Sequence, residues 1–240
     1  MPSTTTTVAE IASHSLSAVR VFEKWGIDYC CGGKRPLADV CREKGLDASR
    51  IEAELTTAGQ LPDTSEVDWN RASLNELANH IVATHHAYLR RELPAIALRL
   101  EKVYRVYNQR YGPTLTGLPE VFAALAAELD AHMMKEEMVL FPSVIAAERA
   151  IAAGQPPPPS CFGTVANPIR MMESEHDSAG QALQSIRRIT HNFEIPGHAC
   201  VTFRALMRGL EELESDLHLH IHLENNILFP RALQQESAGS

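Results

Sequence analysis

Eleven residues decide the fold, because they occur twice in nearly the same form: residues 132–142 are HMMKEEMVLFP and residues 220–230 are HIHLENNILFP. Both copies follow the pattern H-x3-E-x3-LFP. Residues four positions apart lie on the same face of an α-helix, one turn above each other. The repeat therefore predicts two helices, each with an imidazole and a carboxylate pointing the same way, in a chain that contains a duplicated helical hairpin.

The sequence around the two copies has a helical period almost everywhere, and no strand-like alternation competes with it. Four long helices with short connections are expected, over 73–107, 119–150, 168–190 and 198–228. Such a set predicts an all-α antiparallel four-helix bundle. Shorter helices are expected before the bundle, over 8–24, 36–44 and 48–58.

These helices divide the chain into three parts. We expect a small helical domain over 1–58, with a Cys-Cys-Gly-Gly loop between its first two helices. Residues 59–72 have no sustained period and contain Gly, Pro and Asp, so they are interpreted as a linker. The bundle domain follows over 73–240, and its first helix opens on Ser73 and Glu76, which have the spacing of a capping box.

The composition excludes several classes of protein. The 240 residues are 45% hydrophobic, and 22 Lys and Arg stand against 30 Asp and Glu, which gives a net charge of −8. A chain this acidic is a poor match for a nucleic-acid binder, and no apolar run approaches the roughly 18 residues of a membrane span. Five cysteines and no secretory signal over residues 1–10 favour a cytoplasmic protein.

The two His–Glu pairs interrupt apolar stripes, which places them inside the bundle. His132 and Glu136 continue a stripe of leucines on the second long helix, as His220 and Glu224 do on the fourth. Burying a carboxylate or an imidazole without a partner costs several kcal/mol, so these groups need metal, water or one another. The apolar stripes of the other two helices select His176 and His86, and His85 stays open as an alternative to His86. The predicted metal ligands are therefore His86, His132, Glu136, His176, His220 and Glu224.

Four imidazoles and two carboxylates exceed the needs of one tetrahedral zinc ion. They suit two first-row ions bridged by the two glutamates, with an open position on each ion. Nitrogen and oxygen donors of this kind favour non-haem iron, with manganese or zinc as competitors. An open position on a redox-active ion predicts binding of a small molecule such as O2, NO or peroxide.

Several other polar residues have two possible roles each. Glu128 and Glu175 either orient a ligand or lie on the surface as ordinary charges. His218 and His222 are expected on the surface. Cys30 and Cys31 lie close in sequence to Lys34 and Arg35, and these cations favour the thiolate form of a cysteine. The pair is either a reactive thiol site or two buried side chains that only fill space in the core.

With these elements in place, the chain resembles the iron–sulfur cluster repair di-iron proteins, known as the repair-of-iron-centres family. The resemblance rests on the DYCCGGK loop at residues 28–34 and on the motifs HMMKEEMVLFP, MESEHD and HIHLENNILFPRAL. It implies a hemerythrin-like bundle in which the six predicted ligands hold an oxo-bridged and carboxylate-bridged pair of iron ions. Glu128 and Glu175 fall where the family has carboxylates near the metal access route.

The resemblance also implies a function. Members of the family are cytoplasmic stress proteins that restore iron–sulfur clusters damaged by nitric oxide or oxidants, and they are thought to donate iron from a labile site. The expected partners are damaged iron–sulfur proteins, NO and O2, and a homodimer is a family expectation. Cys30 and Cys31 would receive iron or NO, or contact the damaged protein. Two alternatives use the same site: an NO reductase that forms N2O, and a sensor or carrier of NO or O2.

Overall fold

The structure is a computed structural model that describes residues 6–59, 67–111 and 115–238. Throughout these ranges every regular element is a helix, which confirms the all-α prediction. None of the described helices is long and apolar enough to cross a membrane. The chain divides into two compact units, one formed by Asn79–Ser143 and Ser160–Leu217, the other by Met1–Ala78, Val144–Pro159 and His218–Ser240.

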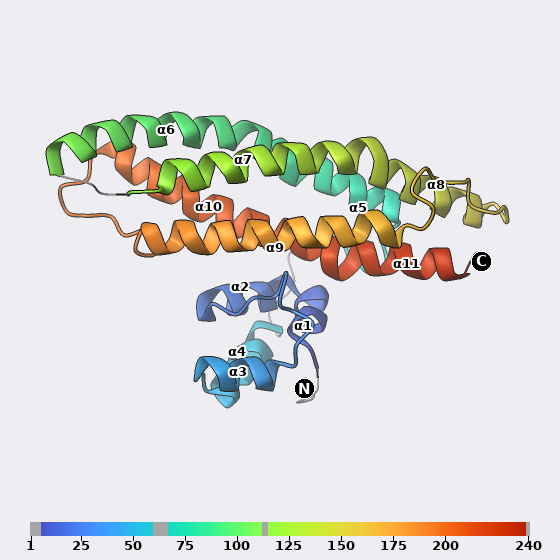
Figure 1. The fold of residues 1–240 in the computed structure, drawn as a ribbon. Coiled ribbons are helices and arrows are strands. Elements are labelled where there is room, and N and C mark those ends of the chain that lie inside the picture. Colours follow the sequence, from blue (N-terminus) through green and yellow to red (C-terminus); the bar gives the residue numbers. More distant parts are fainter. Residues whose placement is uncertain (1–5, 60–66, 112–114, 239–240) are drawn as a thin grey trace. The chain divides into compact units, whose positions relative to one another are not determined.

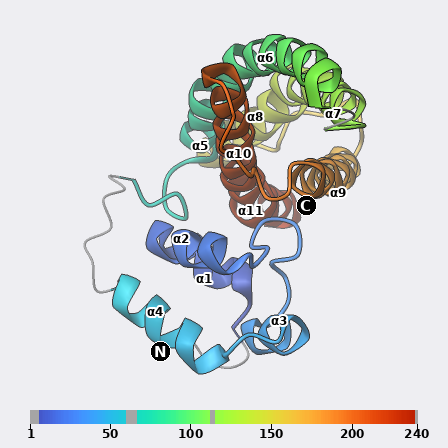
Figure 2. The same ribbon diagram turned by 90° about the vertical axis from the view of Figure 1, so that its left-hand side faces the viewer.

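The first of these units is built on four helices that surround one apolar core (Figure 2). They are α6 (Ala87–Tyr111), α7 (Leu118–Lys135), α9 (Ala166–Ile189) and the part of α10 (Val201–Leu223) that ends at Leu217. Each helix contributes a stripe of buried residues, as the period of its sequence predicts. Members with no measurable exposure include Leu89, Ile96, Leu118, Leu206, Leu213 and Leu217.

Three π-helical turns interrupt these helices: η1 (Val82–His86), η2 (Glu136–Leu140) and η3 (Glu224–Leu228). In η2 and η3 the turn closes when the N–H of the following phenylalanine donates to the carbonyl of Glu136 or Glu224, five residues earlier. A proline follows each phenylalanine, and proline has no N–H for the α-helical ladder. The LFP half of the repeat therefore encodes a widened turn that begins at the glutamate shared by the two copies, and π-turns of this kind are frequent at functional sites.

The helices continue beyond these turns as α8 (Phe141–Ala152) and α11 (Phe229–Ala238). Pro142 lies in the first turn of α8, directly after the π-turn η2. The expected end of the last helix at residue 228 is wrong, because the chain remains helical to Ala238. Proline is tolerated in the first turn of a helix segment, because the backbone N–H that it lacks would have no helical partner there.

The other unit contains four short N-terminal helices, which lie together in Figure 1: α1 (Val8–His14), α2 (Leu16–Trp25), α3 (Leu37–Lys44) and α4 (Ala48–Gly59). The single helix expected over 8–24 is wrong, because Ser15 has extended dihedral angles and its hydroxyl caps α2 by accepting from the Ala18 amide at 3.4 Å. Phe22, Tyr29 and Ile51 form the core of this unit together with Ile221 near the end of α10.

The capping box at the start of α5 (Leu74–Ile81) is confirmed. The Ser73 hydroxyl accepts from the Glu76 amide at 3.1 Å, and the Glu76 carboxylate accepts from the Ser73 amide at 2.9 Å. Half of the predicted linker, residues 60–66, lies outside the described residues, so the predicted division at 59–72 stays a prediction.

Replacing Ile96 by alanine tests the packing of the bundle. Ile96 has no exposed surface, so Ile96→Ala should lower the free energy of unfolding by about 2–5 kcal/mol. Leu98 lies on the same helix and is 69% exposed, so Leu98→Ala should change that free energy by less than about 0.5 kcal/mol. Urea denaturation followed by circular dichroism measures both, and equal effects would contradict the assignment of the core face.

Candidate metal centre

Four predicted ligands meet inside the bundle unit. Glu136 begins η2, and its two carboxylate oxygens face different imidazoles: Oε1 lies 3.3 Å from Nε2 of His132, and Oε2 lies 3.3 Å from Nε2 of His86. His176 on α9 completes the group, with its Nε2 at 3.1 Å from Nε2 of His132. All four side chains are buried, and Glu136 has no measurable exposure. The structure thus brings together residues that are up to 90 positions apart in the sequence.

The donor set fits a bound cation. Within the described part of the chain, neither carboxylate oxygen of Glu136 has a hydrogen-bond partner. A buried carboxylate without compensation costs several kcal/mol, and a cation between the carboxylate and the imidazoles would remove that cost. One oxygen of Glu136 lies beside His86 and the other beside His132, so this carboxylate is placed to serve two neighbouring ions. Nitrogen and oxygen donors without thiolate are typical of non-haem iron sites.

A carboxylate behind His86 fixes the direction of its ring. Nδ1 of His86 is 2.6 Å from Oε1 of Glu137, which also accepts from Arg90 at 2.8 Å. Burial raises the pKa of Glu137, but the hydrogen bonds from Arg90 and His86 outweigh burial and leave this pKa below its ordinary value. An ionised Glu137 holds the Nδ1 proton of His86, so that Nε2 keeps its lone pair toward Glu136.

His132 has the same arrangement. Its Nδ1 lies 2.8 Å from Oε2 of Glu175, and Lys135 donates to the other oxygen of this carboxylate. Burial raises the pKa of Glu175, but the bonds from Lys135 and His132 lower it overall. The interpretation of Glu175 as an orienting residue agrees with this position. Glu137 was missed, although it follows a predicted ligand directly, because the sequence does not show that it faces another helix.

Two further candidates lie elsewhere. Nδ1 of His85 is 2.9 Å from Oδ1 of Asp216 on α10, so the structure places His86, and not His85, beside Glu136. Glu128 is exposed on α7, and its proposed role stays a prediction.

The second copy of the motif lies in the other unit. Nε2 of His220 is 3.0 Å from Oε1 of Glu224, which begins η3, and both side chains are at most 1% exposed. The pair thus has the same local form as His132 and Glu136, with the histidine one turn before a glutamate that opens a π-turn.

The cysteine loop is organised by Asp28. Its carboxylate accepts from the amides of Cys30 and Cys31, both at 3.0 Å, and from the amide of Gly32 at 2.9 Å. The two thiol sulfurs are 3.6 Å apart. The expectation that neighbouring cations favour thiolate is wrong for Cys30, because the adjacent Cys31 thiol and burial raise the Cys30 pKa well above its usual value.

The placement of His222 on the surface is also wrong. Its side chain is 2% exposed, and burial lowers its pKa to about 4, so the ring is neutral at physiological pH. Nδ1 of His222 accepts from the Asn226 amide group at 2.9 Å. The helical period placed His222 away from the bundle core, but it could not show that a distant segment of the chain, the cysteine loop, covers that face.

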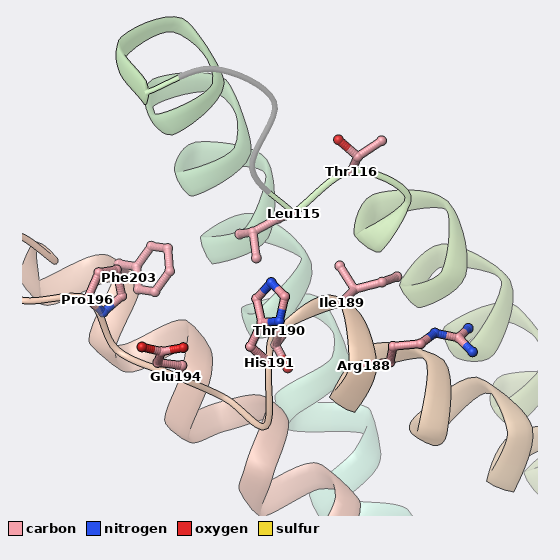
Figure 3. A pocket seen from close by; sticks show the side chains of 9 residues that line it. All are labelled: Leu115, Thr116, Arg188, Ile189, Thr190, His191, Glu194, Pro196 and Phe203. Carbon is pink, nitrogen blue, oxygen red and sulfur yellow. The ribbon is translucent and has the colours of Figure 1, made fainter.

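A hollow of about 500 Å³ lies at the far end of α7 and α9 (Figure 3). It is lined by Leu115, Thr116, Arg188, Ile189, Thr190, His191, Glu194, Pro196 and Phe203. Leu118, the first residue of α7 after the hollow, is about 21 Å from His132 at 1.5 Å per residue. The hollow therefore does not lead directly to the four buried ligands.

Comparison with known families agrees with this geometry. Residues 77–232 match the hemerythrin HHE cation binding domain, and residues 4–59 match ScdA_N, a domain of unknown function. The protein is thus a hemerythrin-domain protein with an additional N-terminal domain.

Curated relatives define the family more closely. A protein of Escherichia coli O157:H7 named iron-sulfur cluster repair protein YtfE is 41% identical over 230 residues, covering 95% of this chain and 97% of the relative. Proteins of the same name from Citrobacter koseri and Escherichia fergusonii are 40% and 41% identical over the same share of each chain. The chain belongs to this family of iron–sulfur cluster repair proteins, which confirms the resemblance found in the motifs.

Replacing Glu137 by glutamine tests the orientation of His86. The variant keeps the shape of the side chain but loses the charge that holds the Nδ1 proton, so metal affinity should fall about 10-fold to 100-fold. Competition with a chelator, followed by elemental analysis, measures the affinity. Asp130→Asn removes one exposed charge from the neighbouring helix α7 and should leave the affinity unchanged. Unchanged affinity in Glu137→Gln would rule out the orienting role.

Proposed function

We propose that this protein repairs damaged iron–sulfur clusters by donating iron from a labile di-iron site, as a cytoplasmic protein of the stress response. The observation that carries the proposal is the buried Glu136 carboxylate, whose two oxygens face His86 and His132 separately. The relatives are named for iron–sulfur cluster repair, which favours this function over NO reduction or the carriage of NO or O2. Damaged iron–sulfur proteins are the proposed partners.

The proposed ligands are His86, His132, Glu136, His176, His220 and Glu224. The inclusion of the last two is supported by the repeated motif, by their positions at the end of α10 and at the start of η3, and by their burial. Glu136 and Glu224 are proposed to bridge an oxo-linked pair of iron ions. When bound, such a pair supplies open coordination positions for NO or O2, and iron that can leave.

The protein's own residues favour release. Four of the six ligands are neutral imidazoles, so the set carries less negative charge than a cage made of carboxylates. Glu137 and Glu175 share their charge with Arg90 and Lys135, which limits how strongly they polarise His86 and His132. These features support a site that orients its ligands yet holds iron loosely enough to give it up.

Replacing a bridging carboxylate tests the function. Glu136→Leu or Glu224→Leu should lose most of the bound iron and should not restore the cluster of an apo iron–sulfur protein under anaerobic conditions. The intact chain should hold two exchange-coupled irons in Mössbauer spectra and should restore the cluster. Retention of two irons by either variant would contradict the bridging assignment. Restored cluster from a variant without iron would instead contradict the donor function, and N2O formation without cluster repair would favour the reductase.

The cysteine pair has a separate expected role. Cys30→Ala with Cys31→Ala should keep two irons per chain, because the proposed ligands are all supplied by the hemerythrin-like domain. Elemental analysis after loading measures this, with the single variant Cys41→Ala as a control for loss of a thiol elsewhere in the same domain. Purification of the double variant without iron would show that the thiols help to hold the metal.

A further inference from the structure

The two copies of the motif differ at the positions that face away from the predicted ligands. In the first copy, Met134 and Met138 are 58% and 75% exposed. The equivalent residues of the second copy are His222, which is 2% exposed, and Asn226, which is half-buried. The second copy therefore carries polar groups on a covered face where the first carries exposed methionines.

The cover is the cysteine loop. The Asn226 amide group donates to the carbonyl of Tyr29 at 3.0 Å, and the Asn225 amide group donates to the carbonyl of Cys30 at 3.3 Å. The Tyr29 ring packs edge-on against His222, with 5.5 Å between ring centroids. Two consecutive side chains on η3 thus hold two consecutive carbonyls of the loop.

The backbone of the loop is constrained internally, so the thiols of Cys30 and Cys31 should move together with the carbonyls of Tyr29 and Cys30. Asp28 accepts three amides of the loop, and a side chain at Gly33 would lie 2.5 Å from the Tyr29 carbonyl, so no larger residue fits there. Cys30 is only 5% exposed while its carbonyl is held. Loss of the two asparagine bonds should therefore expose Cys30.

The asparagines also follow directly on Glu224, whose carbonyl closes the π-turn and whose carboxylate faces His220. We propose that Asn225 and Asn226 are positioning residues that link the thiols to the metal centre: iron held by Glu224 and His220 fixes η3 and keeps the loop docked, and loss of that iron releases the loop and exposes Cys30. This inference rests on the proposed function, because it needs iron at Glu224. The same link requires that undocking the loop weaken iron binding.

The rate at which iodoacetamide alkylates Cys30 tests the link. Iron-loaded and iron-free protein are treated anaerobically, labelled Cys30 is measured by peptide mass spectrometry, and iron is measured in each sample. Alkylation should be at least about five-fold slower in the iron-loaded protein, the lower end of typical coupling between two sites. In Asn225→Ala/Asn226→Ala, and in Asn226→Asp, which keeps the shape but lacks the donor, Cys30 should react fast with or without iron.

Met138→Ala alters the matching position of the first copy and should keep the difference between loaded and iron-free protein. Equal rates in an intact chain that does bind iron would overturn the link and leave the proposed function standing. A chain that binds no iron would overturn both. Persistence of the five-fold difference in the asparagine variants would show that the link does not run through these side chains.

Discussion

The structure depends on a buried carboxylate that needs positive charge. Glu136 has no exposed surface, and its two oxygens face two imidazoles, His86 from another helical segment and His132 from the preceding turn of its own helix. A charge in that position is unfavourable by several kcal/mol unless a cation or a proton compensates it. The apolar stripes fix the helices around this group, and a π-turn starts at Glu136.

Glu136 and Glu224 each begin a π-turn one helical turn after a histidine, but the residues that follow them contact different parts of the protein. After Glu136 the chain continues with Glu137, which reaches back to His86 and serves the centre itself. After Glu224 it continues with Asn225 and Asn226, which hold the cysteine loop. One copy thus strengthens the predicted metal site, while the other connects the same kind of turn to the N-terminal domain.

Much of this could be predicted from the sequence, because the period of a helix determines which of its residues share a face. His132, Glu136 and His176 lie on apolar stripes, and the structure places them together. Features that depend on other segments could not be predicted in this way. His222 has a polar face on its own helix, and its burial comes from a loop almost two hundred residues earlier. The break at Ser15 likewise reflects a local cap that competes with a continuous apolar stripe.

The outer carboxylates bear on the proposal that one site both holds and releases iron. Glu137 and Glu175 are each bonded to an imidazole and to a cation, Arg90 or Lys135. A carboxylate bonded only to the imidazole would draw its proton more strongly and make the ring a better donor to metal. Sharing each carboxylate with a cation keeps the ring in its orientation while reducing that effect. Precise orientation of the ligands is therefore compatible with a reduced affinity for metal, and the proposed donation of iron needs both.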